Sequence, residues 1–267
     1  MYKLIAIDID DTLITDSKEV TPATQTALEQ AVAAGVVVTL ATGRAYASAQ
    51  AIARQTGLNV PIITYQGALV KNLLDEKVLY ERYVPQDAVR KLFTYCVEHD
   101  LHLQTYIDDK LYAREENQKL IDYSTLNGTQ YYIEPDWEKL VPQKTPKMLI
   151  IDDPAFLDEL APILRELLGD SVHITKSKPY FLEIMHHEGT KGLALEFLAN
   201  HFGCDLSETI AVGDSWNDHE MLEAAGLGVA MENAIPALKE IADFITFSNN
   251  EDGVKHVIEK FILQNAE

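Results

Sequence analysis

The feature of the sequence that most constrains the fold is an alternation between short runs of β-branched or apolar residues and segments that carry helix start and stop signals. Strands are predicted for residues 3–9, 36–41 and 61–65. Between them, one helix is predicted to start at Thr21-Pro22 and another to span residues 45–56. This order of elements is typical of a parallel α/β sheet with helices packed on its faces.

The alternation stops after about residue 82 and resumes at Lys191. In between, apolar residues mark one helical face over 89–97 and alternate as in a strand over 101–107, and a strand, a helix and two strands are predicted within 147–185. From Lys191 onward, the predicted helices are 191–202, 217–225 and 235–242, and the predicted strands are 209–212, 228–231 and 244–246. We therefore predict an α/β sheet domain formed by residues 1–83 and 187–267, interrupted by an α+β domain at 84–186.

The charge of the chain disfavours several classes of partner. Its 42 acidic residues outnumber its 22 basic ones, which gives a formal net charge of −20. Such a field repels nucleic-acid backbones and anionic membrane surfaces, so neither is expected as a partner. The apolar runs are much shorter than the roughly 18 residues of a membrane span, and the first residues lack the pattern of a secretion signal. A cytoplasmic location is expected, and Cys96 and Cys204, which stand in no ligand spacing, are expected to be buried thiols.

Four short polar clusters follow apolar runs, at the places where strands should end. They are Asp8-Ile9-Asp10-Asp11-Thr12, Thr42-Gly43-Arg44, Gly189-Thr190-Lys191-Gly192 and Gly213-Asp214-Ser215-Trp216-Asn217-Asp218. Ligands of open α/β sheets bind at the carboxyl ends of the strands, so this placement favours a functional site. Together the clusters supply an oxygen nucleophile, a second carboxylate, a hydroxyl, a cation and possible metal ligands.

The first cluster suggests nucleophilic and acid–base chemistry. Asp8 and Asp10 are two residues apart, so their side chains lie on one side of an extended chain. An Asp carboxylate can attack phosphorus and form an aspartyl-phosphate, which makes Asp8 the candidate nucleophile. Asp10 can protonate the departing oxygen and then activate water. The alternative, a solvated strand end in an acid-rich chain, is weakened by the other three clusters.

The second and third clusters supply groups for binding a phosphoryl group. The Thr42 hydroxyl can bond a phosphoryl oxygen, Gly43 allows close backbone approach, and a following helix start favours an anion. Thr42 alone would more often be a simple helix cap. Lys191, at the return to the α/β pattern, can neutralise charge that develops in the transition state, although a surface lysine is the ordinary interpretation.

The fourth cluster suggests a cradle for Mg²⁺, which prefers hard oxygen ligands. Its alternative is a capped helix start. The carboxylates of Asp8 and Asp214, with a backbone carbonyl near Asp10, would leave room for a phosphate oxygen and waters. Asn217 and Asp218 are expected to orient these ligands and Lys191. A local Mg²⁺ would also offset the repulsion between an acidic chain and a phosphorylated substrate.

In this order, the four clusters resemble the motifs of the haloacid dehalogenase superfamily, and the match covers nearly the whole chain. More narrowly, they resemble the Cof-type phosphatases, which carry a large α+β (C2-type) cap between the second and third motifs. The resemblance implies a Rossmann-like core and a catalytic set of Asp8, Asp10, Thr42 and Lys191. It further implies phosphate contacts at Thr42 and Lys191, and Mg²⁺ held by Asp8, Asp10 and Asp214. Asp11, Gly43 and Arg44 are expected to bind the substrate as well. One departure is Gln66-Gly67, where similar proteins usually have Asn-Gly.

The function expected from these observations is Mg²⁺-dependent hydrolysis of small phosphomonoesters, such as sugar phosphates, with the cap excluding water and selecting the leaving group. A phosphomutase of the same superfamily is one alternative, and a phosphate-binding module without turnover is another. Glu183, His186, Arg44 and Arg114 are further candidates for the cleft, but each fits an ordinary surface or strand-end role. The sequence predicts neither the particular substrate nor the oligomeric state.

Overall fold

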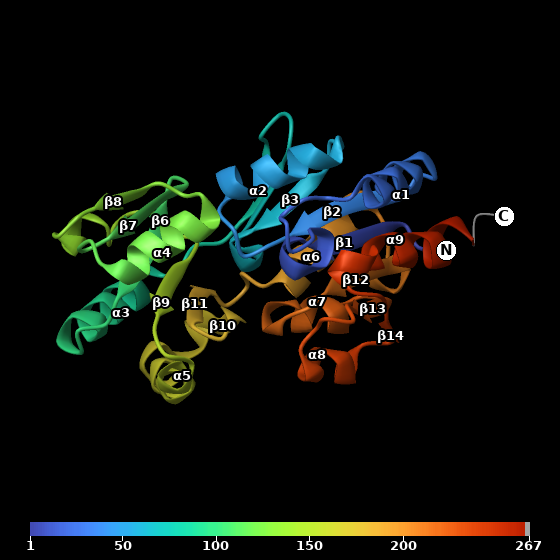
Figure 1. The fold of residues 1–267 in the computed structure, drawn as a ribbon. Coiled ribbons are helices and arrows are strands. Elements are labelled where there is room, and N and C mark those ends of the chain that lie inside the picture. Colours follow the sequence, from blue (N-terminus) through green and yellow to red (C-terminus); the bar gives the residue numbers. More distant parts are fainter. Residues whose placement is uncertain (265–267) are drawn as a thin grey trace.

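The computed structural model describes residues 1–264 and shows two units, each built on its own sheet (Figure 1). The larger unit contains an eight-stranded sheet and both ends of the described chain. The smaller unit contains a six-stranded sheet whose strands all lie within residues 103–186. Separate clusters of buried apolar side chains fill the two units. The predicted fold class, an α/β core with an inserted α+β unit, is therefore confirmed, while the boundaries at 83/84 and 186/187 stay a prediction.

The eight-stranded sheet is parallel through its central strands. Its strand order is β14-β13-β12-β1-β2-β3-β4-β5, and all pairs from β14 to β3 are parallel. The strands are β1 (Leu4–Asp8), β2 (Val37–Ala41), β3 (Pro61–Thr64), β4 (Leu69–Asn72), β5 (Val78–Glu81), β12 (Thr209–Gly213), β13 (Leu227–Ala230) and β14 (Phe244–Ile245). Since β1 lies between β2 and β12, the residues that follow these three strands meet at one edge.

Helices cover the faces of this sheet and bury its apolar side chains. They are α1 (Pro22–Ala33), α2 (Tyr46–Ala53), α6 (Lys191–Phe202), α7 (His219–Ala224), α8 (Pro236–Ile241) and α9 (Gly253–Ile258). Helix α1 packs against α9 and α6 packs against α7. The start predicted for the first helix is confirmed, because the Thr21 hydroxyl accepts a hydrogen bond from the Thr24 N–H and Pro22 takes the first helical position. The helix predicted for 45–56 is shorter, since Arg54–Thr56 tightens into a 3-10 turn.

The smaller unit is an α+β layer with helices on its sheet. Its strand order is β10-β11-β9-β6-β7-β8, and every pair except β7–β8 is antiparallel. The strands are β6 (Leu103–Ile107), β7 (Lys110–Ala113), β8 (Tyr131–Ile133), β9 (Met148–Ile151), β10 (Val172–Lys178) and β11 (Phe181–His186), and the helices are α3 (Gln86–Glu98), α4 (Gln118–Asn127) and α5 (Pro154–Leu168). In the described part of the chain, no helix is long and apolar enough to cross a membrane.

Candidate active site

The site is built where β1, β2 and β12 end, on the side of the sheet that faces the smaller unit. Asp8 is the last residue of β1, and it is 5% exposed. Beyond it the backbone turns sharply, and Asp11 adopts the left-handed conformation with φ 60°. Strand β1 therefore ends one residue earlier than predicted, because this turn redirects Asp10 and Asp11 away from the sheet.

Lys191 forms ion pairs with Asp8 and with Asp218 of the fourth cluster. Its Nζ donates to Asp8 Oδ1 at 2.5 Å and to Asp218 Oδ1 at 2.7 Å, and its side chain is fully buried. Thr190 caps helix α6, so the first residue of that helix is held at the site. The structure thus brings together Asp8 and Lys191, which are 183 residues apart in the chain.

Asp218 organises the loop after β12. Its Oδ2 accepts the backbone N–H groups of Asp214 at 3.0 Å and Ser215 at 3.1 Å, while its other oxygen accepts from Lys191. Thr12 donates to Asp214 Oδ1 at 3.0 Å. The helix predicted for 217–225 is consequently split into a 3-10 turn at Trp216–Asp218 and the shorter helix α7.

The site holds more buried negative charge than its own cation can balance. Burial raises the pKa of Asp8 well above its usual value even though Lys191 acts in the opposite direction. Burial and the charges of Asp218 and Asp11 raise the pKa of Asp214 to about 7. Burial alone would lower the pKa of Lys191, but Asp218 and Asp8 hold it above its usual range.

The donor set suits a divalent cation. Oxygen atoms of Asp8, Asp214 and Asp218 lie within 4.8 Å of one another. Three carboxylates facing one ammonium leave a net charge of about −2 in a buried place, and hard oxygen ligands of this kind are those that Mg²⁺ prefers. Asp218 was expected to orient the ligands, and in the structure its carboxylate lies within this group.

Asp10 makes a different contact from the one expected for a metal ligand. Its two carboxylate oxygens accept from Arg44 Nε and Arg44 Nη2, each at 2.7 Å. Burial would raise the pKa of Asp10, but the hydrogen bonds and the charge of Arg44 hold it below its usual value. The role predicted for the Asp10 side chain toward a metal stays a prediction.

The loop after β2 is fixed by close packing. Thr42 is 1% exposed, and its hydroxyl accepts the Arg44 N–H at 3.1 Å. A Cβ on Gly43 would lie 2.3 Å from Nε2 of Gln66, so a larger residue cannot fit without displacing that amide. Gln66, at the departure from the usual Asn-Gly, is therefore part of the wall behind this loop.

A cavity of about 90 Å³ lies between the two units. Its walls include the predicted residues Asp8, Asp10, Thr42, Gly43, Arg44, Asp214 and Asn217. They also include Lys18, Tyr123, Leu126, Asn127, Lys147, Ser177, Lys178, Phe181, Glu183 and Ser215. Most ligand pockets occupy roughly 300–1,000 Å³, so little free space is left between the two units at the site.

Sequence reasoning found the residues of the larger unit and missed most of those from the smaller one. Glu183, one of the four further candidates for the cleft that also fit an ordinary surface or strand-end role, is 2% exposed and lines the cavity. A signal was present, since it is an acid within the otherwise apolar run Phe181-Leu182-Glu183-Ile184-Met185. By contrast, Arg114 lines a separate depression near His102. Lys178 reaches across to Asp11 with a hydrogen bond, which no local pattern predicts.

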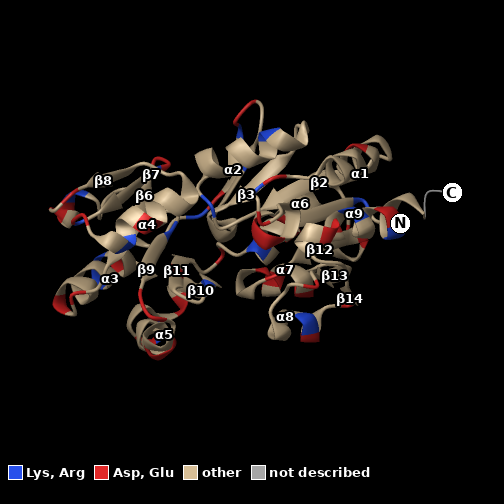
Figure 2. Cartoon of the chain, in the orientation of Figure 1, with Lys and Arg blue, Asp and Glu red and all other residues tan. Residues whose placement is uncertain are grey.

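Asp and Glu are spread over both units (Figure 2), yet cations gather at the cavity. Lys18 lies 3.6 Å from Asp10 and 3.9 Å from Asp11, and it lines the cavity together with Arg44 and Lys178. These side chains offset part of the negative charge where a phosphorylated ligand would enter.

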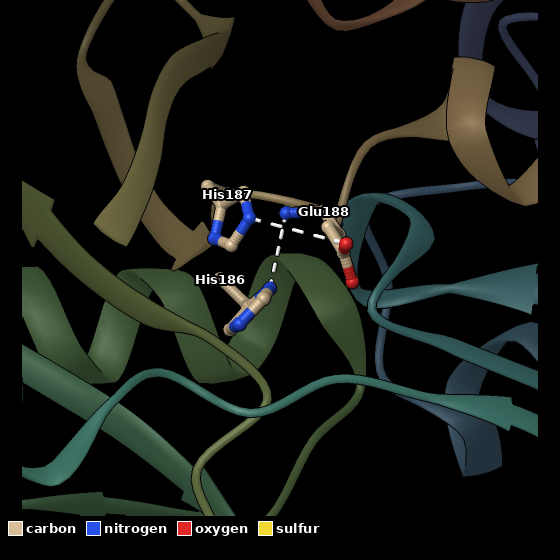
Figure 3. Close-up of side chains that lie close together, drawn as sticks. All are labelled: His186, His187 and Glu188. Atoms are coloured by element: carbon tan, nitrogen blue, oxygen red, sulfur yellow. Dashed lines mark hydrogen bonds and ion pairs between the residues drawn. The ribbon is translucent and has the colours of Figure 1, made fainter. Parts of the chain in front are cut away.

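A second group of possible metal ligands lies on the segment that leaves β11 (Figure 3). His186, His187 and Glu188 bring ligand atoms within 4.8 Å of one another. However, His186 Nδ1 accepts the Glu188 N–H, and Arg82 Nε donates to the Glu188 carboxylate at 2.5 Å. The centroids of the two imidazole rings are 4.2 Å apart, and the ring planes are 34° from parallel. These contacts tie the segment to Arg82.

Comparison with known proteins agrees with this geometry. The model of the haloacid dehalogenase-like hydrolase family matches residues 5–258, and the chain belongs to that family. Its predicted place among the Cof-type phosphatases is confirmed.

The similarity to individual proteins extends over nearly the whole chain. The crystal structure of TM0651 from Thermotoga maritima shares 35% sequence identity, covers 98% of both chains and has a TM-score of 0.84. The 5-amino-6-(5-phospho-D-ribitylamino)uracil phosphatase YitU of Bacillus subtilis is 32% identical over 97% of both chains. The HMP-PP phosphatase of Yersinia pestis is 31% identical over 90% of this chain and 87% of its own.

Proposed function

We propose that this phosphatase is a Mg²⁺-dependent hydrolase of small phosphomonoesters that works through an aspartyl-phosphate on Asp8. The observation that carries the proposal is the placement of Asp8. It ends the central strand, lines the cavity between the two units and is held by the buried ammonium of Lys191. A carboxylate oriented in this way, beside a cation and away from bulk water, is suited to attack phosphorus.

The reaction then proceeds in two displacements. The Asp8 carboxylate attacks phosphorus, the bond from phosphorus to the ester oxygen breaks, and Asp10 gives its proton to the departing oxygen. A water molecule that loses its proton to Asp10 next attacks the aspartyl-phosphate, which releases inorganic phosphate and restores Asp8. Lys191 offsets the negative charge that develops on the phosphoryl oxygens, and the Thr42 hydroxyl and Gly43 N–H orient them.

Arg44 connects substrate binding to the state of Asp10. In the structure its guanidinium forms two hydrogen bonds with the Asp10 carboxylate and favours the ionised form. A bound phosphoryl group competes for the same guanidinium, because its oxygens are equally good acceptors for a bidentate arginine. When Arg44 turns to the phosphoryl group, the pKa of Asp10 rises toward the range in which it can act as an acid.

The residues that would hold Mg²⁺ are Asp8 and Asp214, with Asp218 beside them and Asp10 contributing through its backbone or its side chain. When bound, Mg²⁺ offsets charge on the carboxylates and on the phosphoryl oxygens. Asp218 remains anchored to Lys191 and to two backbone N–H groups, so it also keeps the loop after β12 in place.

We further propose that the smaller unit, predicted as residues 84–186, is a cap that selects the leaving group in a cytoplasmic enzyme. It contributes Tyr123, Phe181 and Lys178 to the cavity, so an aromatic and a cationic surface face the leaving group. Curated relatives are named for HMP-PP and for a phosphorylated ribitylaminouracil, which supports small phosphorylated metabolites as the substrate class. A cavity of about 90 Å³ requires the cap to move before such a molecule enters.

The test is phosphate release from a panel of phosphorylated sugars, nucleotides and pyrimidine derivatives, measured with Mg²⁺ and with a chelator. Wild type should turn over some compounds only with Mg²⁺, and Asp8→Asn should be inactive while keeping its fold. Formation of an isomerised sugar phosphate without phosphate release would indicate a mutase instead. Wild-type turnover retained by Asp8→Asn would refute the assignment of the nucleophile.

A further inference from the structure

An ion pair of the smaller unit is buried at its boundary with the larger one. Lys147 directly precedes β9, and Glu183 lies in β11, which pairs with β9. Lys147 Nζ is 2.8 Å from Glu183 Oε1. Their side chains are 1% and 2% exposed. Removing two charges from water is costly unless each has good partners, so the position of this pair calls for an explanation.

The remaining partners of both charges come from the larger unit. Lys147 Nζ donates to the backbone oxygen of Gly43 at 2.5 Å, and the side-chain amide of Gln66 donates to Glu183. Gln66 Oε1 in turn accepts from Asn217 Nδ2 at 2.8 Å. The ion pair is therefore fully satisfied only while the two units are closed against each other.

These partners belong to the loops that form the phosphoryl site. Gly43 directly follows Thr42, and the Gln66 backbone N–H donates to the Thr42 oxygen at 3.1 Å. Asn217 lies in the loop that carries Asp214 and Asp218. Both loops are thus tied to the smaller unit by hydrogen bonds that end on Lys147 and Glu183.

We propose that Lys147, Glu183, Gln66 and Asn217 form a cap–core relay that positions the Thr42–Gly43 loop and the Asn217 amide when the cap closes. Lys147 and Glu183 are positioning residues in this account, because they act through Gly43 and Gln66. The inference deepens the proposed function and rests on it. It also explains the departure at Gln66, whose longer side chain spans the gap from Asn217 to Glu183.

The physical basis is an exchange of partners on closure. In an open arrangement, water solvates Lys147 and Glu183, and the Gly43 carbonyl is free to move. On closure that water is lost, and the charges are compensated only if Gly43 and Gln66 stand at the correct places. The closed state therefore selects one geometry of the phosphoryl site, and misplacement of reacting groups by about 1 Å can reduce a rate by roughly a hundredfold.

The competing explanation is direct contact with the leaving group, since Lys147 and Glu183 also line the cavity. The two explanations differ in their dependence on substrate. A relay acts on the phosphoryl end, so its loss lowers turnover of every substrate by a similar factor. A leaving-group contact matters only for substrates large enough to reach it, and acetyl phosphate is too small to do so.

The experiment compares wild type with Lys147→Met/Glu183→Gln, which removes both charges together and leaves neither unpaired, and with Gln66→Met. Lys119→Met is the matched control, because Lys119 also forms a 2.8 Å ion pair in the smaller unit, with Asp152, but the two side chains are 40% and 27% exposed. We expect kcat to fall about tenfold to a hundredfold in both relay variants on acetyl phosphate and on a larger substrate alike, with little change in KM. The control should keep the wild-type kcat.

A second readout does not depend on turnover. Hydrogen–deuterium exchange of the full-length protein should be faster at the amides of Arg44 and Gln66 in both relay variants, and unchanged at these amides in Lys119→Met. A loss of kcat confined to the larger substrate, or unchanged exchange at these amides in folded relay variants, overturns the relay. If wild type hydrolyses no compound, the proposed function fails, and the exchange measurement alone then decides whether the relay exists.

Discussion

Replacing Lys191 with methionine tests how the buried charges of the site are balanced. Lys191 is fully buried between Asp8 and Asp218, which are also buried. Methionine keeps much of the volume but removes the ammonium, which leaves three carboxylates without a cation. Loss of one partner from a buried ion pair costs about 3–5 kcal/mol, so we expect the free energy of unfolding of the metal-free protein to fall by that amount. For a chain of this size, the melting temperature falls on the order of 10 °C.

Two features separate this charge effect from a simple packing defect. Adding Mg²⁺ should recover more stability in Lys191→Met than in wild type, because the ion supplies the missing positive charge. Adding Asp218→Asn should also recover stability, since it removes one carboxylate while its amide oxygen can still accept the Asp214 N–H. Neither change should restore hydrolysis, because a donor that offsets transition-state charge is worth roughly a hundredfold to a thousandfold in kcat.

The measurements are thermal unfolding in chelator and in Mg²⁺, and phosphate release by the same preparations. Arg82→Gln is a suitable control, because its ion pair with Glu188 lies on the surface and should matter by less than about 1 kcal/mol. If Lys191→Met in chelator melts at the wild-type temperature, the reasoning about the buried charges is wrong. It is equally wrong if Asp218→Asn deepens the loss of stability.

Three further predictions concern Gly43, Asp214 and Lys178. Gly43→Ala should lower the free energy of unfolding by about 1–3 kcal/mol and reduce phosphate release, because the added Cβ would meet the Gln66 amide. A variant as active and as stable as wild type would contradict the close packing. Burial raises the pKa of Asp214 to about 7, so without metal this carboxyl group stabilises the fold at low pH, where it is protonated. This stabilisation is lost as the pH rises from about 4 through 7. Melting curves in chelator should show the loss, and Mg²⁺ should reverse it. Lys178→Ala removes a half-exposed ion pair with Asp11 and should change the melting temperature little. The KM for anionic substrates should rise several-fold. An unchanged KM would show that Lys178 does not face the substrate.

Much of the larger unit could be predicted because its signals are local. The start of α1 at Thr21-Pro22 is fixed by a hydroxyl and a proline that are adjacent in sequence. The alternation of apolar runs with helices likewise indicates a parallel sheet without knowledge of any contact. Residues 112–142 carry no clear periodicity, and there the structure forms short elements, such as β8 at Tyr131–Ile133, whose burial is irregular. Such elements depend on their neighbours more than on their own pattern.

The smaller unit's share of the site could not be predicted, for a physical reason. Sequence patterns record which side chains are apolar and how they repeat, but not which distant charge will compensate a buried one. Glu183 meets Gln66 over a separation of 117 residues, and Lys147 meets Gly43 over 104. Similarly, the turn at Asp11 directs Asp10 to Arg44, and this contact does not follow from spacing.

The sequence by itself determined the α/β rhythm and the chemical groups that the site contains, because strand ends, caps and motifs are encoded by neighbouring residues. Only the tertiary structure decided how the charges of the two units are paired, Arg44 with Asp10 and Lys147 with Glu183. Burial makes these pairings matter, since a charge removed from water is tolerated only where the fold supplies its partner.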